Sequence, residues 1–188
     1  ARGALERLIA EESVRGEVIA TLEPLYESER DFQRLADLLV TKLTVTADAG
    51  ERALIYGRIA ELAEDELSDH VRALDAVGGQ LAEDPGSDEA LLELERLAEL
   101  TSRFGEMAAR LRGIIPSVES EPVRLSLLSK LGAVELDREH DLASAERTHR
   151  AVLDLGDSFF YVGAVAEESG VMQGEIVAEY WNANPDAD

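Results

Sequence analysis

The feature that most constrains this chain is an internal repeat with a period of 72 residues. Residues 52–85 align on residues 124–157 without a gap, and the match extends back to the first residue. Identical pairs include Arg52 with Arg124, Asp65 with Asp137, Asp69 with Asp141, Ala73 with Ala145, Leu22 with Leu94, Phe32 with Phe104, and Leu39 with Leu111. Two copies of one structural unit are therefore expected.

Apolar residues keep their character across the period even where they differ in identity. Ile55 aligns with Leu127 and Ile59 with Leu131, and their spacing is that of one face of a helix. The pattern predicts helices at 15–28, 32–44, 51–66, 70–83, 88–101, 104–115, 123–138 and 142–155. Residues 1–11 are predicted to be the second helix of a further pair, with Leu5, Leu8 and Ile9 packed on the next pair.

Short polar side chains mark the expected helix starts. Asp69 and Asp141 stand where they accept backbone N–H bonds, and Asp48 followed by Glu51 resembles a capping box. Pro122 suits the first turn of a helix. Pro24 conflicts with this scheme, because it lies inside a predicted helix, which should therefore be kinked or begin late.

Small residues recur where two helices of a pair would cross. They are Ala60 and Gly132 on the first helix and Ala73 and Ala145 on the second, followed by Val77 and His149 at a bulky position, with Pro85 closing one copy. This pattern resembles tetratricopeptide repeats of the bacterial type with lengthened helix pairs, over residues 1–157. The resemblance implies an all-α fold, an α-solenoid of antiparallel helix pairs in a right-handed superhelix. A HEAT-like array is the alternative.

The repeat stops after residue 157, so residues 158–188 are expected to form a separate segment. Its apolar and aromatic residues include Phe159, Phe160, Tyr161, Val171, Ile176, Tyr180 and Trp181. A cap over the last helix pair is favoured, because a repeat array must cover its terminal apolar face. The alternative is that residues 171–181 act as a ligand in cis, or exchange with a second molecule to make a homodimer. The open N-terminal end is a second candidate dimer contact.

A formal net charge of -22 disfavours nucleic acid and anionic membranes as partners, because both would repel the chain. The expected partner is a protein or peptide, with a basic one favoured. The chain has no cysteine, no apolar run long enough for a membrane helix and no signal-peptide pattern. A cytoplasmic location is favoured over secretion, and the chain is interpreted as an excerpt from a longer protein.

We find no residue pattern typical of catalysis. His70, His140 and His149 lack the spacing of a zinc-binding helix. His70 and His140 are predicted to be exposed turn residues, and His149 a packed histidine. The sequence therefore predicts no enzyme, no metal and no cofactor.

The tetratricopeptide resemblance implies that the first helix of each pair lines a concave, ligand-binding face. Ala20, Leu54, Gly57, Leu92, Ser126 and Ser129 map onto that face together with eight acidic candidates, Glu23, Glu27, Glu61, Glu64, Asp65, Glu95, Glu99 and Asp137. The alternative is that these carboxylates form an ordinary solvated surface.

Three functions remain open. The first is a non-catalytic interaction scaffold that binds a basic peptide or helical segment. The second is a structural spacer in a larger repeat protein. The third is a regulatory region of an enzyme whose catalytic domain lies elsewhere.

Overall fold

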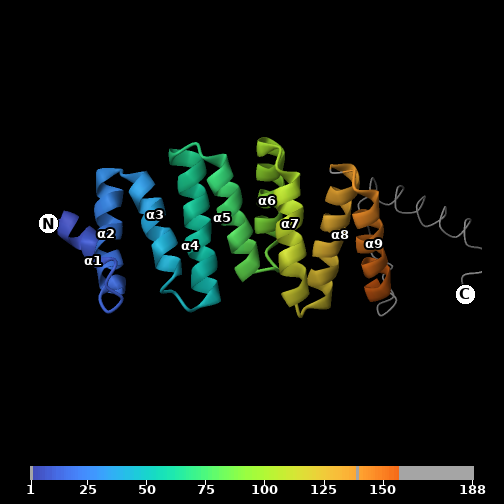
Figure 1. The fold of residues 1–188 in the computed structure, drawn as a ribbon, viewed down its shortest axis with the longest axis horizontal. Helices are drawn as coiled ribbons and strands as arrows, with labels where there is room; N and C mark the ends of the chain where they lie inside the picture. Colours follow the sequence, from blue (N-terminus) through green and yellow to red (C-terminus); the bar gives the residue numbers. More distant parts are fainter. Residues whose placement is uncertain (1, 139, 157–188) are drawn as a thin grey trace, which may run out of the picture. The chain divides into compact units, whose positions relative to one another are not determined.

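The computed structural model describes residues 2–138 and 140–156, and this part of the chain is helical and contains no strand (Figure 1). The helices are α1 (Arg2–Leu8), α2 (Arg15–Glu29), α3 (Phe32–Leu43), α4 (Ala49–Glu61), α5 (His70–Glu83), α6 (Asp88–Thr101), α7 (Phe104–Ile114), α8 (Glu121–Asp137) and α9 (Leu142–Gly156). A π-helical turn, η1 (Leu62–Glu66), continues α4, and a 3-10 turn, η2 (Ile115–Ser117), follows α7. The predicted helices are confirmed, with ends that differ by at most three residues when η1 is counted with α4.

The chain divides into two compact units, residues 1–152 and 153–188. In the first unit, each helix from α1 to α7 packs against the next one in the chain. Figure 1 shows α2 to α8 side by side in chain order, from blue to gold. His149 of α9 lies against Gly132 of α8, so the same sequential packing reaches α9.

The 72-residue period is visible in the backbone. The helices α3, α4 and α5 begin at residues 32, 49 and 70, and α7, α8 and α9 begin 72 residues later, at 104, 121 and 142. Left-handed residues also recur, since Arg30 and Ser102 have φ of 56° and 57° and Ser68 and His140 have φ of 52° and 54°. Such residues end helices by letting the next N–H groups bond back to free carbonyls. The two copies therefore share helix ends as well as helix starts.

The predicted caps are confirmed. The carboxylate of Asp69 accepts from Arg72 N at 3.0 Å, that of Asp141 from Ser144 N at 3.0 Å, and that of Asp48 from Glu51 N at 2.8 Å. Each bond satisfies an N–H group that has no partner within its helix. Pro122 lies in the first turn of α8, as predicted.

The core consists of the apolar residues that the period preserves. Buried pairs at equivalent positions are Leu22 with Leu94, Leu35 with Met107, Ala36 with Ala108, Leu39 with Leu111, Ile55 with Leu127, and Ile59 with Leu131. Ala73, Ala145 and Gly132 are buried as predicted, whereas Ala60 is only half-buried at the edge of the core.

One prediction about the first 30 residues is wrong, and one of the two alternatives for the helix that contains Pro24 is excluded. Leu8 is 43% exposed, and only Leu5 and Ile9 pack on the core, because α1 ends at Leu8, where the Arg15 guanidinium binds the Ile9 carbonyl at 2.8 Å. The helix α2 does not begin late but runs through Pro24. Pro24 and Ala20 are both exposed, so water can bind the Ala20 carbonyl that has lost its helical donor.

The residues predicted to form a cap or a cis-ligand, Phe159, Phe160, Tyr161, Val171, Ile176, Tyr180 and Trp181, lie outside the described residues.

Candidate interaction surface

The acidic candidates lie on α2, α4 with η1, α6 and the end of α8, which we call the even-helix surface. Two leucines stand out on it, because Leu54 of α4 is 75% exposed and Leu92 of α6 is 63% exposed. Their equivalents in the other copy are small, Ser126 and Ala20. The two large apolar groups therefore belong to the two middle helices of the set.

Four of the acidic candidates pair with a basic residue of the next even-numbered helix. Glu64 is the closest, with a carboxylate oxygen 2.6 Å from Nη2 of Arg96. The others are Glu27 with Arg58 at 3.2 Å, Glu95 with Lys130 at 2.7 Å, and Glu99 with Arg138 at 3.6 Å. These contacts form an ion-pair ladder from α2 through α4 and α6 to α8.

The remaining candidates differ in their partners. Glu23 pairs with Lys42 of α3 at 2.8 Å, and Glu61 pairs with Arg58 one turn away at 3.3 Å. Asp65 and Asp137 are exposed and make no ion pair within the described residues. The even-helix surface therefore keeps surplus negative charge near Glu61, Asp65 and Asp137.

Arg96 is the most strongly held cation of the ladder. It donates to both Glu93 and Glu64, and these hydrogen bonds raise the pKa of the Arg96 guanidinium above its usual range. The same bond to Arg96 lowers the pKa of Glu93. These charges are therefore engaged in an ion pair that bridges η1 and α6, and a ligand would have to displace them.

The odd-numbered helices carry their own bridges on another side of the unit. Asp37 of α3 binds Arg72 of α5 at 2.7 Å, and Asp75 of α5 binds Arg110 of α7. Arg110 also lies across Gly78, where an added Cβ would lie 2.8 Å from its Nε. These bridges close the grooves between α3 and α5 and between α5 and α7.

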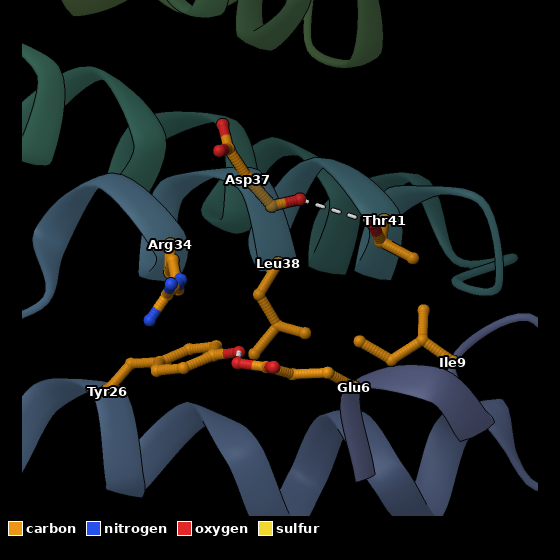
Figure 2. Close-up of a pocket in the computed structure, with 7 residues that line it drawn as sticks. All are labelled: Glu6, Ile9, Tyr26, Arg34, Asp37, Leu38 and Thr41. Carbon is orange, nitrogen blue, oxygen red and sulfur yellow. Dashed lines mark hydrogen bonds between the residues drawn. The ribbon is translucent and has the colours of Figure 1, made fainter. Parts of the chain in front are cut away.

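An open cavity of about 250 Å³ lies between α1 and α3 over α2 (Figure 2). The Tyr26 hydroxyl donates to Glu6 at 3.0 Å. Burial of the hydroxyl raises the pKa of Tyr26 most, and the bond to Glu6 raises it further. Figure 2 shows the Asp37 carboxylate turned away from the cavity, toward the neighbouring helices. Leu38 stands where the other copy has Arg110, so the arginine that lies across Gly78 in the groove between α5 and α7 has a shorter, apolar equivalent here.

A second open cavity, of about 300 Å³, lies between α7 and α9 over α8. One of its walls is the carboxylate of Glu135, which is only 1% exposed. Arg112 donates to Glu135 from Nε at 3.0 Å, and the Thr148 hydroxyl donates at 2.7 Å. The guanidinium and the hydroxyl together offset the cost of burying the Glu135 carboxylate, so its negative charge is neutralised within the protein.

The histidines lie apart from one another. His70 opens α5, is half-buried, and has Nδ1 3.8 Å from a Glu64 oxygen, so it is less exposed than predicted. His140 is exposed, whereas the half-buried His149 has Nδ1 2.7 Å from the Ala145 carbonyl oxygen. Within residues 2–138 and 140–156, no three His, Asp or Glu side chains gather as a metal site would require.

In the same two ranges, no helix is long and apolar enough to cross a membrane.

The sequence carries a signal for the Glu135 site in the 72-residue period. Its equivalent in the first copy is Ala63, a fully buried alanine, so a charged residue stands at a core position of the period. Its partners Arg112 and Thr148 likewise replace Val40 and Ala76. Three residues that contact one another therefore all differ from their equivalents 72 residues earlier, which marks a local departure from the repeat.

No known family model matches this chain, and no solved structure matches it.

Proposed function

We propose that this protein is a non-catalytic interaction scaffold whose even-helix surface binds a basic, amphipathic segment of another protein. The proposal rests above all on Leu54 of α4 and Leu92 of α6, which are 75% and 63% exposed, and on the exposed Asp65 of η1, which makes no ion pair within the described residues. Exposed apolar side chains rimmed by charge are typical of protein-binding surfaces. A lysine- or arginine-rich segment with apolar anchors complements both features.

We further propose that the helices form a right-handed solenoid of antiparallel pairs, similar to a tetratricopeptide array. The recurrence of helix starts and left-handed caps at 72 residues supports this arrangement. In such an array the even-numbered helices share one face, and side chains at equivalent positions form a continuous strip along it.

The binding test uses two model peptides of equal length and charge, one built from lysine and leucine and one from lysine and serine. We expect the lysine–leucine peptide to bind more tightly, with an affinity that falls as salt increases. The double variant Leu54→Ser, Leu92→Ser should remove the difference between the peptides. Isothermal calorimetry at two salt concentrations measures both effects.

Matched controls lie on α9. Leu142 is 70% exposed, and the Glu146 side chain is 72% exposed and pairs, within the described residues, only with Arg150 of the same helix, so Leu142→Ser and Glu146→Lys should leave peptide affinity unchanged. Asp65→Lys should weaken binding, because it puts a positive charge on a surface that attracts a basic peptide. Asp65 makes no ion pair within the described residues whose loss would confuse the result. Equal affinities for the two peptides would show that only non-specific charge attraction drives binding, and this result would overturn the proposal.

The ion-pair ladder supports a second candidate function, a structural spacer. Its charges join α2, α4, α6 and α8 to one another. A spacer would bind neither peptide specifically, and its ladder variants would change only mechanical or thermal stability. The same calorimetric comparison therefore separates the two functions.

A further inference from the structure

The cavity between α7 and α9 has a filled counterpart in the first copy. There, the Tyr56 ring of α4 packs on Gly79 of α5 so closely that an added Cβ at Gly79 would lie 2.7 Å from the ring atom Cδ1. The equivalents of this pair in the second copy are Leu128 and Ala151, and both line the cavity. The second copy thus lacks an aromatic ring at a position where the first copy has one.

The groove also lacks the bridge that closes its counterpart. Asp37 and Arg72 join α3 to α5 at 2.7 Å, whereas the equivalent residues are Ala109 and Ser144. Loss of the long Arg side chain and of the Tyr ring at one place leaves about 300 Å³ open. A cavity of about half that volume is enough to bind benzene in a protein interior.

The lining suits an aromatic group with a hydroxyl. Leu128 and Ala151 supply apolar wall, and the guanidinium of Arg147 makes no ion pair within the described residues, although it donates to Ser144 Oγ at 3.0 Å. A guanidinium of this kind is electrostatically complementary to the negative face of a ring. The Thr148 hydroxyl donates to Glu135, so its oxygen keeps acceptor capacity for a phenol.

We propose that this cavity is a binding site for a tyrosine side chain of a partner protein, distinct from the even-helix surface. The ring would lie on Leu128 and Ala151 under Arg147, as the Tyr56 ring lies on Gly79. The site is independent of the acidic surface and of its basic partner, so either proposal can fail alone.

The test is a titration of the full chain with N-acetyl-tyrosinamide, followed by the methyl resonances of Leu128 and Ala151. We expect both to shift, while the Leu54 methyls on the even-helix surface do not. The cyclohexylalanine analogue has a similar shape without a π face and should bind more weakly. Arg147→Gln, a change at an exposed side chain, should weaken binding by about two- to fivefold, the factor of an exposed cation–π contact.

Two further variants exchange the copies. Leu128→Tyr with Ala151→Gly places the first copy's ring in the cavity and should abolish the shifts. Tyr56→Leu with Gly79→Ala should create no second set of shifts in the first copy, because Arg72 still bridges to Asp37 there and Asp75 stands where the second copy has Arg147. Absence of shifts at Leu128 up to millimolar probe, equal binding of the cyclohexyl analogue, or contacts in the free protein between Leu128 methyls and an aromatic ring of the chain itself would overturn the proposal.

Discussion

Nη2 of Arg112 lies 2.8 Å from Oε1 of Glu135, and Glu135 is only 1% exposed to solvent. The Thr148 hydroxyl satisfies the second carboxylate oxygen at 2.7 Å. A buried carboxylate is tolerated only when its hydrogen-bonding capacity is filled, because removing it from water is expensive. The three residues therefore act as one unit, even though their equivalents in the first copy are apolar.

We expect Arg112→Val to destabilise the protein by about 3 kcal/mol, because it leaves the Glu135 carboxylate without its cation. The triple variant Arg112→Val, Glu135→Ala, Thr148→Ala installs the first copy's residues and should be more stable than Arg112→Val, because it removes the buried charge together with its partners, while its smaller side chains keep it below the parent. Chemical denaturation followed by circular dichroism measures both. If the single and triple variants lose the same stability, the three residues are not coupled.

His149 lies against Gly132, and their contact gives a second prediction. A Cβ at Gly132 would lie 2.7 Å from Cε1 of the His149 ring, which is held by the Ala145 carbonyl at 2.7 Å. Gly132→Ala should therefore destabilise the protein by about 1 kcal/mol, because overpacking outweighs the gain in helix propensity.

Two controls test that explanation. An added Cβ at Gly113 of α7 meets nothing within 4 Å, so Gly113→Ala should gain about 0.5–1 kcal/mol from helix propensity alone. The double variant Gly132→Ala, His149→Val reproduces Ala60 and Val77 of the first copy and should recover the loss. If the effects of Gly132→Ala and His149→Val on the denaturant midpoint simply add in the double variant, the contact between the two residues is not the cause of the destabilisation.

The helices and their caps could be predicted from the sequence, because the information for them is local. The apolar spacing fixes the helix faces, and an Asp three residues before a free N–H group, as at Asp69 and Asp141, caps a helix without help from distant residues. The period also identified the buried small residues Ala73 and Ala145, because packing positions recur with the unit.

The charge contacts could not be predicted in the same way, because they depend on which side chains meet between helices. Glu64 and Arg96 are 32 residues apart and pair only because the fold brings η1 and α6 within reach of these two side chains. A carboxylate on a predicted surface looks the same in sequence whether it pairs, as Glu64 does, or makes no ion pair within the described residues, as is the case for Asp65. Cavities have the same origin, since the one beside Leu128 results from several substitutions that meet only in the folded chain.

Pro24 gives a prediction about backbone hydrogen bonding. It lies ten residues into the 15-residue helix α2, where it lacks the N–H that would bind the Ala20 carbonyl. Pro24→Ala restores that bond at an exposed position and should raise stability by about 1–3 kcal/mol. Pro122 lies in the first turn of α8, where no such bond is lost, so Pro122→Ala should give no comparable gain. Thermal melts of the two variants make the comparison, and equal melting temperatures for both would contradict it.

Asp141 gives a prediction about pH. Its carboxylate accepts from the Ser144 hydroxyl at 2.6 Å and from the Ser144 N–H at 3.0 Å, and these bonds hold the pKa of Asp141 below its usual range. A pKa that is lower in the folded than in the unfolded chain adds stability above the unfolded value, and that stability is lost as pH falls through the folded value. Ser144→Ala removes one of the two bonds, so the pKa of Asp141 should rise toward its ordinary value and the loss of stability in acid should become smaller. Carboxyl carbon chemical shifts followed from pH 7 to pH 2 measure the midpoint directly, and Ser126→Ala, at an exposed serine of α8, is the matched control. An unchanged Asp141 midpoint in Ser144→Ala would show that the backbone N–H alone sets the pKa.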